Sequence, residues 1–146
     1  MSCLSCQRGS SLLEVLIAVL VLAIGVLGAA SLQLNALRFN ASAAHSTLAS
    51  FIAYDILDRM RANYQQLDQY VTQISGDCQR VSVLEQDILA RDLADLHEAV
   101  SCLLPGGTAT VERQDARVIV TITWSETRIV AGQADTRFVV SSEIGL

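Results

Sequence analysis

The spacing of the apolar residues changes twice along this chain, and each change predicts a different kind of element. Residues 12–34 are apolar on every side of a helix, with Glu14, Ser31 and Gln33 as the only strongly polar side chains. A helix of this length crosses a hydrocarbon core of about 30 Å at 1.5 Å per residue. We therefore expect a membrane-spanning helix. Near its start lies one carboxylate, whose unpaired burial in the membrane costs on the order of 3 kcal/mol.

Apolar residues continue at helical spacing after this stretch, while polar residues begin to separate them. No Gly or Pro interrupts residues 29–75. The sequence therefore predicts one helix from Ser11 to about Gln66, apolar all round in its first half and amphipathic in its second. The positions expected on the apolar stripe are Leu34, Leu37, Ala41, Ala44, Leu48, Phe51, Ile52, Ile56, Met60, Tyr64 and Leu67.

A polar segment, residues 68–80, is predicted to connect this helix to a second one. Ser82 and Glu85 have the spacing of a capping box, which marks a helix start. Pro105, followed by two glycines, predicts the helix end. The apolar residues expected on one face of this second helix are Leu84, Ile88, Leu93, Leu96, Val100 and Leu103.

Beyond Gly107 the period of the apolar positions becomes two, which is typical of strands. The pattern predicts strands at residues 109–113, at residues 118–124 and around Phe138 and Val140, with a short hairpin at residues 114–116. The predicted fold is α+β. It has a long N-terminal membrane-spanning helix, a short second helix and a three-stranded antiparallel sheet packed on the long helix.

The carboxylate of Glu14 lies four residues after Ser10, about one helical turn. If the chain were cut between Gly9 and Ser10, the new α-amino group could pair with this carboxylate, either in the same chain or in a neighbouring copy. A plain single-span anchor leaves Glu14 unexplained. Cleavage as a secretory signal after residue 29 or 30 is less favoured, because no small-x-small site follows the apolar stretch.

The run from Arg8 to Leu16, RGSSLLEVL, resembles the class III signal of type IV pilins and type II secretion pseudopilins. The resemblance implies that a prepilin peptidase cuts after Gly9, that Ser10 becomes the N-methylated first residue, and that Glu14 serves assembly. The family usually has Phe or Met at the position of Ser10. It further implies a leader at residues 1–9, a transmembrane and filament-core half-helix at residues 10–34, and a periplasmic globular domain at residues 35–146.

Three later motifs, DLADL at residues 92–96, LPGGT at residues 104–108 and VTITW at residues 120–124, resemble the PilV class of minor type IV pilins. That resemblance implies a single-pass inner-membrane protein that enters the pilus at its tip, with roles in adhesion and twitching motility. The implied partners are other minor and major pilins, contacted through the long helix, and a tip adhesin. A minor pseudopilin of type II secretion, of the GspI class, is the nearest alternative.

The four cysteines fall into two pairs. Cys3 and Cys6 form a CxxC in the leader, without the further ligands that a zinc site needs. Cys78 and Cys102 fall in the expected exterior domain, where disulfides persist. We favour a bond between them, and two buried thiols are the alternative.

We expect a structural protein rather than an enzyme, because no nucleophilic side chain has a base close to it in the sequence. A formal charge of −5 argues against nucleic acid as a partner. No motif indicates a cofactor or a metal site, and His45 and His97 are expected to be ordinary helix-face residues. Asp92, Asp95 and Glu98 share a helical face, which we interpret as solvated. The alternatives are an anchored periplasmic enzyme that uses these carboxylates, or an anchored ligand-binding module.

Overall fold

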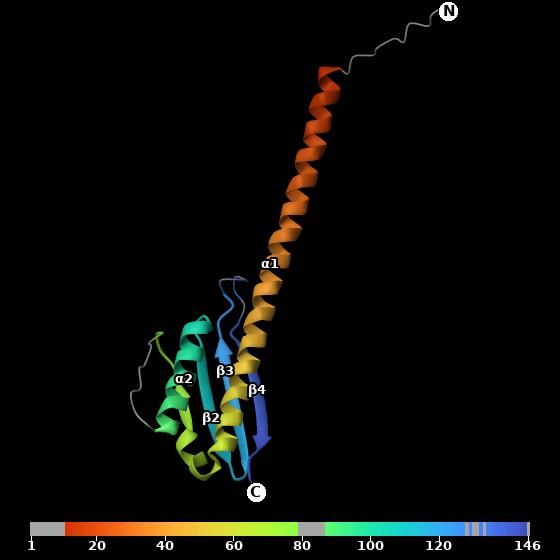
Figure 1. The fold of residues 1–146 in the computed structure, drawn as a ribbon. Helices are drawn as coiled ribbons and strands as arrows, with labels where there is room; N and C mark the ends of the chain where they lie inside the picture. Colours follow the sequence, from red (N-terminus) through yellow and green to blue (C-terminus); the bar gives the residue numbers. More distant parts are fainter. Residues whose placement is uncertain (1–10, 79–86, 128, 130–131, 133, 146) are drawn as a thin grey trace, which may run out of the picture. The chain divides into compact units, whose positions relative to one another are not determined.

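The computed structural model describes residues 11–78, 87–127, 129, 132 and 134–145. The chain divides into two compact units, Met1–Phe39 and Asn40–Leu146. Figure 1 shows the order of the elements along the chain. The predicted α+β class is confirmed, since a long apolar N-terminal helix and a short second helix accompany an antiparallel sheet.

The first helix, α1 (Leu12–Ala62), is continuous over 51 residues. At its start the Ser11 hydroxyl accepts a hydrogen bond from the backbone N–H of Glu14 at 3.3 Å, as an N-cap does. The predicted end near Gln66 was wrong, because α1 ends at Ala62 and a 3₁₀ helix, η1 (Tyr64–Tyr70), follows. Asn63 breaks the α-helix with φ −118° and ψ 42°, and its side chain donates to side chains of η1.

The second unit contains a four-stranded antiparallel sheet in the order β1-β2-β3-β4. Its strands are β1 (Thr72–Ile74), β2 (Thr108–Gln114), β3 (Arg117–Trp124) and β4 (Thr136–Glu143). The sequence predicted the last three strands and placed β1 in a polar connection. This strand of three residues is too short to show alternation, and its place depends on pairing with Ala109, Thr110 and Val111 of β2.

A tight turn joins β2 to β3, where Gln114 pairs with Arg117. Asp115 adopts a positive φ of 56°, a conformation that Asp tolerates better than most residues. Its carbonyl accepts a hydrogen bond from Nε of Arg113 at 2.7 Å. The hairpin predicted at this point is therefore present, and Val118, Val120 and Ile122 of β3 are buried in the core.

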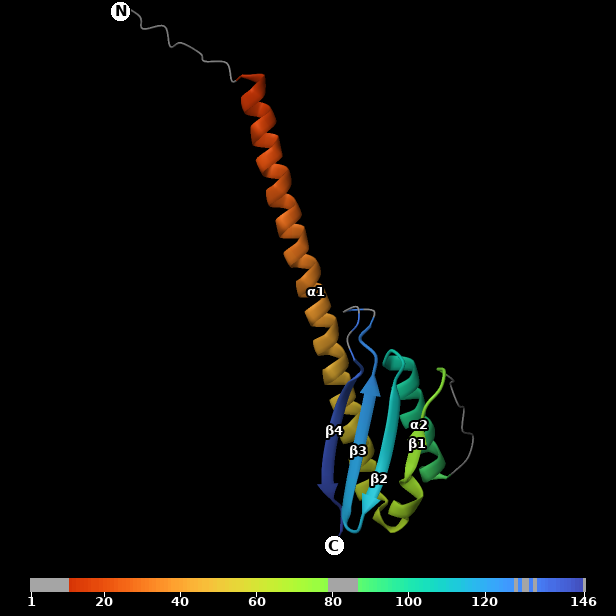
Figure 2. The same ribbon diagram turned by 180° about the vertical axis from the view of Figure 1, so that it is seen from behind.

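Within the second unit, α2 and the last turns of α1 cover the same face of the sheet, as Figures 1 and 2 show from opposite sides. Alternate residues of β3 face these helices and are at most 1 % exposed: Val118, Val120, Ile122 and Trp124. From α1 the buried residues are Ala49, Ile52, Ala53, Ile56, Leu57 and Met60. The core is thus a single layer between two helices and one sheet face.

The predicted apolar stripe of the long helix was wrong at five positions, because Leu34, Leu37, Ala44, Phe51 and Tyr64 are exposed. Phe51 is 67 % exposed and Tyr64 is 44 % exposed. The sheet instead contacts a stripe that includes Ala53 and Leu57, which lie four residues apart on one helix face. The ring of Tyr54 meets Phe138 of β4 edge-on, with ring centroids 6.4 Å apart.

The second helix is α2 (Ile88–Leu103), capped at its start by Asp87, whose Oδ1 accepts from the N–H of Leu89 at 3.0 Å. The predicted capping box at Ser82 and Glu85, and Leu84, lie outside the described residues. Leu96 and Val100 are buried as expected. Ile88 and Leu103 are 66 % and 54 % exposed, which corrects the predicted face. Leu89 and Leu93 pack against the core on the same side of the helix as Leu96 and Val100.

Candidate functional site

The first unit presents an uncovered apolar surface. Its large apolar side chains between residues 12 and 34 are 51–79 % exposed. The most apolar 18-residue window of α1 has a mean hydropathy of 2.8, and none of it is buried. By length and composition this helix can cross a membrane. A surface of this kind needs lipid or other helices against it, which is consistent with membrane anchoring.

Glu14 lies in the first turn of α1 and is exposed. A negative charge at this position interacts favourably with the helix dipole, whose positive end is at the N-terminus. Gly9 and Ser10 lie outside the described residues. The cut after Gly9, the methylation of Ser10 and the pairing of Glu14 with an amino terminus therefore stay predictions.

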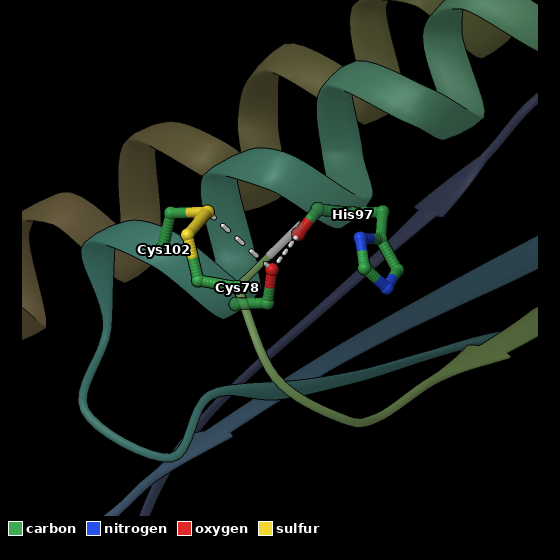
Figure 3. Close-up of a disulfide and its surroundings, with 4 residues drawn as sticks. Cys78, His97 and Cys102 are labelled. Atoms are coloured by element: carbon green, nitrogen blue, oxygen red, sulfur yellow. Dashed lines mark hydrogen bonds between the residues drawn. A yellow bond between two sulfur atoms is a disulfide. The ribbon is translucent and has the colours of Figure 1, made fainter. Parts of the chain in front are cut away.

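A disulfide joins Cys78 to Cys102, with the two Cα atoms 4.6 Å apart (Figure 3). It links the segment after β1 to the last turn of α2. The hydroxyl of Ser101, next to Cys102, donates to the carbonyl of His97 at 2.7 Å. The bond closes the segment that contains residues 79–86 and most of α2, and so ties that helix to the sheet edge.

The sequence-predicted carboxylates of α2 do not form one solvated face. Asp92 is buried, and both of its oxygens are occupied. Nη1 of Arg59 donates to Oδ1 at 2.9 Å, and the hydroxyl of Tyr70 donates to Oδ2 at 2.6 Å. Asp95 is exposed, as expected, and accepts from the same Nη1 at 2.8 Å.

Arg59 thus becomes the centre of an ion-pair cluster with Asp55, Asp92 and Asp95. Burial alone would lower the pKa of its guanidinium, but hydrogen bonds to Asp92 and Asp95 and the charge of Asp55 outweigh that effect and raise the pKa. Burial, followed by the hydrogen bond to Asp92, raises the pKa of Tyr70 to about 12. The cluster holds α1, η1 and α2 together through one carboxylate.

This arrangement is more typical of a structural pair than of an acid–base dyad. A general acid or base needs a carboxyl oxygen within reach of a substrate, and both oxygens of Asp92 already accept hydrogen bonds within the fold. The sequence interpretation of Asp92 as solvated was wrong. Its partner Arg59 lies 33 residues away in the sequence, so no local pattern could reveal the pairing.

Sequence reasoning also missed Glu126, a carboxylate that is only 2 % exposed. The hydroxyl of Ser42 lies 2.9 Å from both of its oxygens, and Nε1 of Trp124 donates to Oε1 at 3.1 Å. These bonds connect the start of the second unit, on α1, to the end of β3. Trp124 is a core residue, as predicted, and its indole N–H is satisfied there.

The two histidines lie on the helices where the sequence placed them, His45 on α1 and His97 on α2. Within the part of the chain that the structure describes, neither Nδ1 atom has a hydrogen-bond partner. No group of three or more His, Cys, Asp or Glu side chains suited to a metal ion occurs among the same residues.

Comparison with known proteins gives one match, at the N-terminus. A family model described as the prokaryotic N-terminal methylation motif matches residues 4–30. The motif supports a type IV pilin-like, prepilin-type protein. It covers Gly9, Glu14 and most of the apolar stretch, and it points to a structural protein family whose members associate with other pilins and with prepilin peptidase. No curated protein and no solved structure matches the chain.

Proposed function

We propose that this protein is a minor pilin of a type IV pilus, of the PilV class, cut by prepilin peptidase after Gly9. The observation that carries the proposal is the methylation motif at residues 4–30, which includes the start of an exposed apolar helix with Glu14 in its first turn. The protein would reside in the inner membrane with its globular domain in the periplasm. It would then enter the pilus at its tip.

In this proposal the cut converts an unfavourable charge into one half of an ion pair. The new amino group of Ser10, methylated or not, is a cation at the membrane entrance. Pairing it with Glu14 of a neighbouring subunit offsets the cost of burying both charges and sets the axial position of one helix against the next. Residues 1–9 are then the leader, residues 10–34 the filament-core half of the helix and residues 35–146 the periplasmic domain.

The assignment to the PilV class draws on the three motifs of the second unit. DLADL falls on α2, LPGGT runs from the end of α2 to the first residue of β2, and VTITW lies at the end of β3. Leu96, Leu104 and Trp124, one residue from each motif, are buried, so each motif contributes to the core. The proposed partners are other minor and major pilins and a tip adhesin.

The first experiment measures the cut. We expect co-expression with a prepilin peptidase to shorten the chain by residues 1–9 and to add a methyl group at Ser10, as intact-mass spectrometry would show. Gly9→Val should block the cut, whereas Ser10→Phe, which restores the usual family residue, should preserve it. A chain that keeps its leader in a piliated strain would contradict the proposal.

The second experiment separates cleavage from assembly. We expect Glu14→Ala to be cut normally but to be lost from sheared pili, because the buried amino group loses its partner. Glu112→Ala, which removes an exposed glutamate of β2, is the matched control and should assemble normally. Equal recovery of both variants in pili would remove the assembly role of Glu14.

The nearest alternative is a minor pseudopilin of the GspI class, because the same N-terminal motif fits it equally well. Deleting the gene from the host distinguishes the two. Loss of twitching with intact protein secretion favours the pilin, and loss of secretion with intact twitching favours the pseudopilin.

A further inference from the structure

A small notch lies between α1 and α2 on the surface of the second unit. Its volume is about 210 Å³, and its walls are Phe51, Ile52 and Asp55 of α1 and Asp95, Leu96 and Ala99 of α2. We call this the α1–α2 notch. Ligand pockets for small molecules usually measure about 300–1,000 Å³, so the notch is closer in size to one long side chain.

The floor of the notch is apolar and one wall is an uncovered aromatic ring. Ile52 and Leu96 are 7 % and 4 % exposed, whereas Phe51 is 67 % exposed. A phenylalanine ring on a helix surface offers a face to which a cation is attracted. The aliphatic part of a long side chain would cover the floor at the same time.

The charged side chains of the notch carry an excess of negative charge. Asp55, Asp92 and Asp95 share the single guanidinium of Arg59, which contacts one oxygen of each. Asp92 is buried and its second oxygen is taken by Tyr70. Asp55 and Asp95 have side chains that are 61 % and 52 % exposed, so their carboxylates are accessible at the notch rim.

We propose that the α1–α2 notch receives an arginine or lysine side chain from a helix of another prepilin-type subunit. The cation would bind the carboxylates of Asp55 and Asp95 and the face of Phe51, with its stem on the apolar floor. The choice of a subunit as partner rests on the proposed function, in which α1 packs against other subunits. The charge complementarity does not depend on it.

The test begins with a photo-crosslinker in place of Phe51, in the full chain and in a host that makes its own prepilin-type subunits. Ile88, on α2 and outside the notch walls, is the matched control because its exposure, 66 %, equals that of Phe51 within one per cent. We expect a crosslink to a second prepilin-type subunit from position 51, at a yield about tenfold above that from position 88. Peptide mapping should place the crosslink beside an arginine or lysine of that subunit.

Charge dependence is then tested on the same crosslink. Asp55→Asn with Asp95→Asn should lower its yield about tenfold, because the charge-assisted bonds are lost. Asp58→Asn is the control, since the side chain of Asp58 on α1 is 70 % exposed, more than Asp55 or Asp95, but lies outside the notch walls. Replacing the partner's basic residue by Glu should abolish the crosslink, and adding Asp95→Arg should restore it in part. Fluorescence of the single Trp124 would show that the variants remain folded.

A yield at position 51 no higher than at position 88 would overturn the proposal. A crosslink that forms only to a second copy of this chain would also overturn it. The same holds for a crosslink whose yield is unchanged in the Asp55→Asn, Asp95→Asn variant. Cleavage after Gly9, measured in the same cells, separates this failure from failure of the proposed function. A cut chain without the crosslink overturns the notch alone. An uncut chain that still forms a charge-dependent crosslink overturns the pilin assignment and retains the notch as a site for a cationic side chain.

Discussion

The hydroxyl of Tyr70 donates a hydrogen bond to Oδ2 of Asp92 at 2.6 Å, and both side chains are buried. Because Arg59 occupies the other oxygen of Asp92, this one carboxylate joins α1, η1 and α2. A buried charge of this kind is favourable only while its partners remain, and removing one partner leaves another polar group without compensation. The relationship therefore predicts where the globular unit is most sensitive to polar substitutions.

Asp92→Ala should lower the free energy of unfolding by about 3 kcal/mol, because it leaves the Tyr70 hydroxyl buried without an acceptor. Asp95→Ala removes an exposed member of the same cluster and should cost about 1 kcal/mol or less. Denaturant unfolding of the full chain in detergent, followed by Trp124 fluorescence, measures both. Equal losses for the two variants would show that the buried position of Asp92 confers no special role.

The raised pKa of Tyr70, about 12, predicts a pH dependence of stability. In the unfolded chain a tyrosine titrates near its ordinary pKa of about 10, so on raising the pH the unfolded state loses this proton first. The stabilisation is complete below pH 10 and should decline by about 2 kcal/mol as the pH rises to 12. All ten basic residues of the chain are arginines, so no lysine titrates in this window.

Tyr70→Phe should remove most of this decline, at the cost of a lower free energy of unfolding at neutral pH. Tyr64→Phe, at a residue that is 44 % exposed, should retain it. Unfolding measured at pH 9 and pH 12 gives the difference directly. A decline of the same size in Tyr70→Phe would assign the alkaline sensitivity to other groups.

The order of the elements was predictable because the long helix, the second helix and three strands each have a clear apolar period. The features that the sequence did not predict, β1 and the exposed position of Phe51, depend on contacts between residues that are distant in the sequence. β1 is three residues long and is defined by its pairing with β2. Phe51 was assigned to the core because the apolar spacing of a helix does not show which of its sides faces the sheet. In the structure Ala53 and Leu57 are buried on the side that faces the sheet, and Phe51 is exposed.

The same limit applies to the candidate sites. Glu14 attracts attention from sequence alone, because one charge in an apolar stretch is conspicuous whatever the fold. The sequence alone does not indicate that Asp92 and Glu126 are buried. Asp92 is paired with Arg59, which lies 33 residues away, and Glu126 is bonded to Ser42, which lies 84 residues away. The α1–α2 notch likewise combines residues of two helices that only packing brings side by side.

The disulfide between Cys78 and Cys102 closes a loop with a sequence separation of 24. In the chain-entropy model a loop of this size contributes about 3 kcal/mol by restricting the unfolded state. Replacing both cysteines by Ser should lower the free energy of unfolding by about that amount, and a reducing agent should have the same effect on the unmodified chain. Replacing Cys3 and Cys6 is the control and should change nothing. A reducing agent without effect would argue against the bond.

Ser42 should contribute more to the stability of the fold than a serine on the surface of a helix usually does. It donates to the buried carboxylate of Glu126, which Trp124 also contacts. Ser42→Ala should lower the free energy of unfolding by about 1–3 kcal/mol, because Glu126 keeps its burial and loses a donor. Ser46→Ala, one turn further along α1 at an exposed position, should be close to neutral. Similar values for the two variants would indicate that Glu126 is solvated in solution.

The two glycines after Pro105 should respond differently to alanine, although they are adjacent. A Cβ atom at Gly107 would lie 2.1 Å from the carbonyl oxygen of Val100, a backbone atom in the last turns of α2. To relieve that overlap, the backbone at Gly107 must move away from α2. Gly107→Ala should therefore lower the free energy of unfolding by about 3 kcal/mol or more, as overpacking of a core does. Gly106 has a φ of +60° but its added Cβ would meet only an ordinary contact at 3.7 Å. Gly106→Ala should therefore cost only about 1 kcal/mol, the strain of a left-handed conformation. If Gly106→Ala proved the more damaging, backbone conformation rather than the close approach to α2 would explain why glycine follows Pro105.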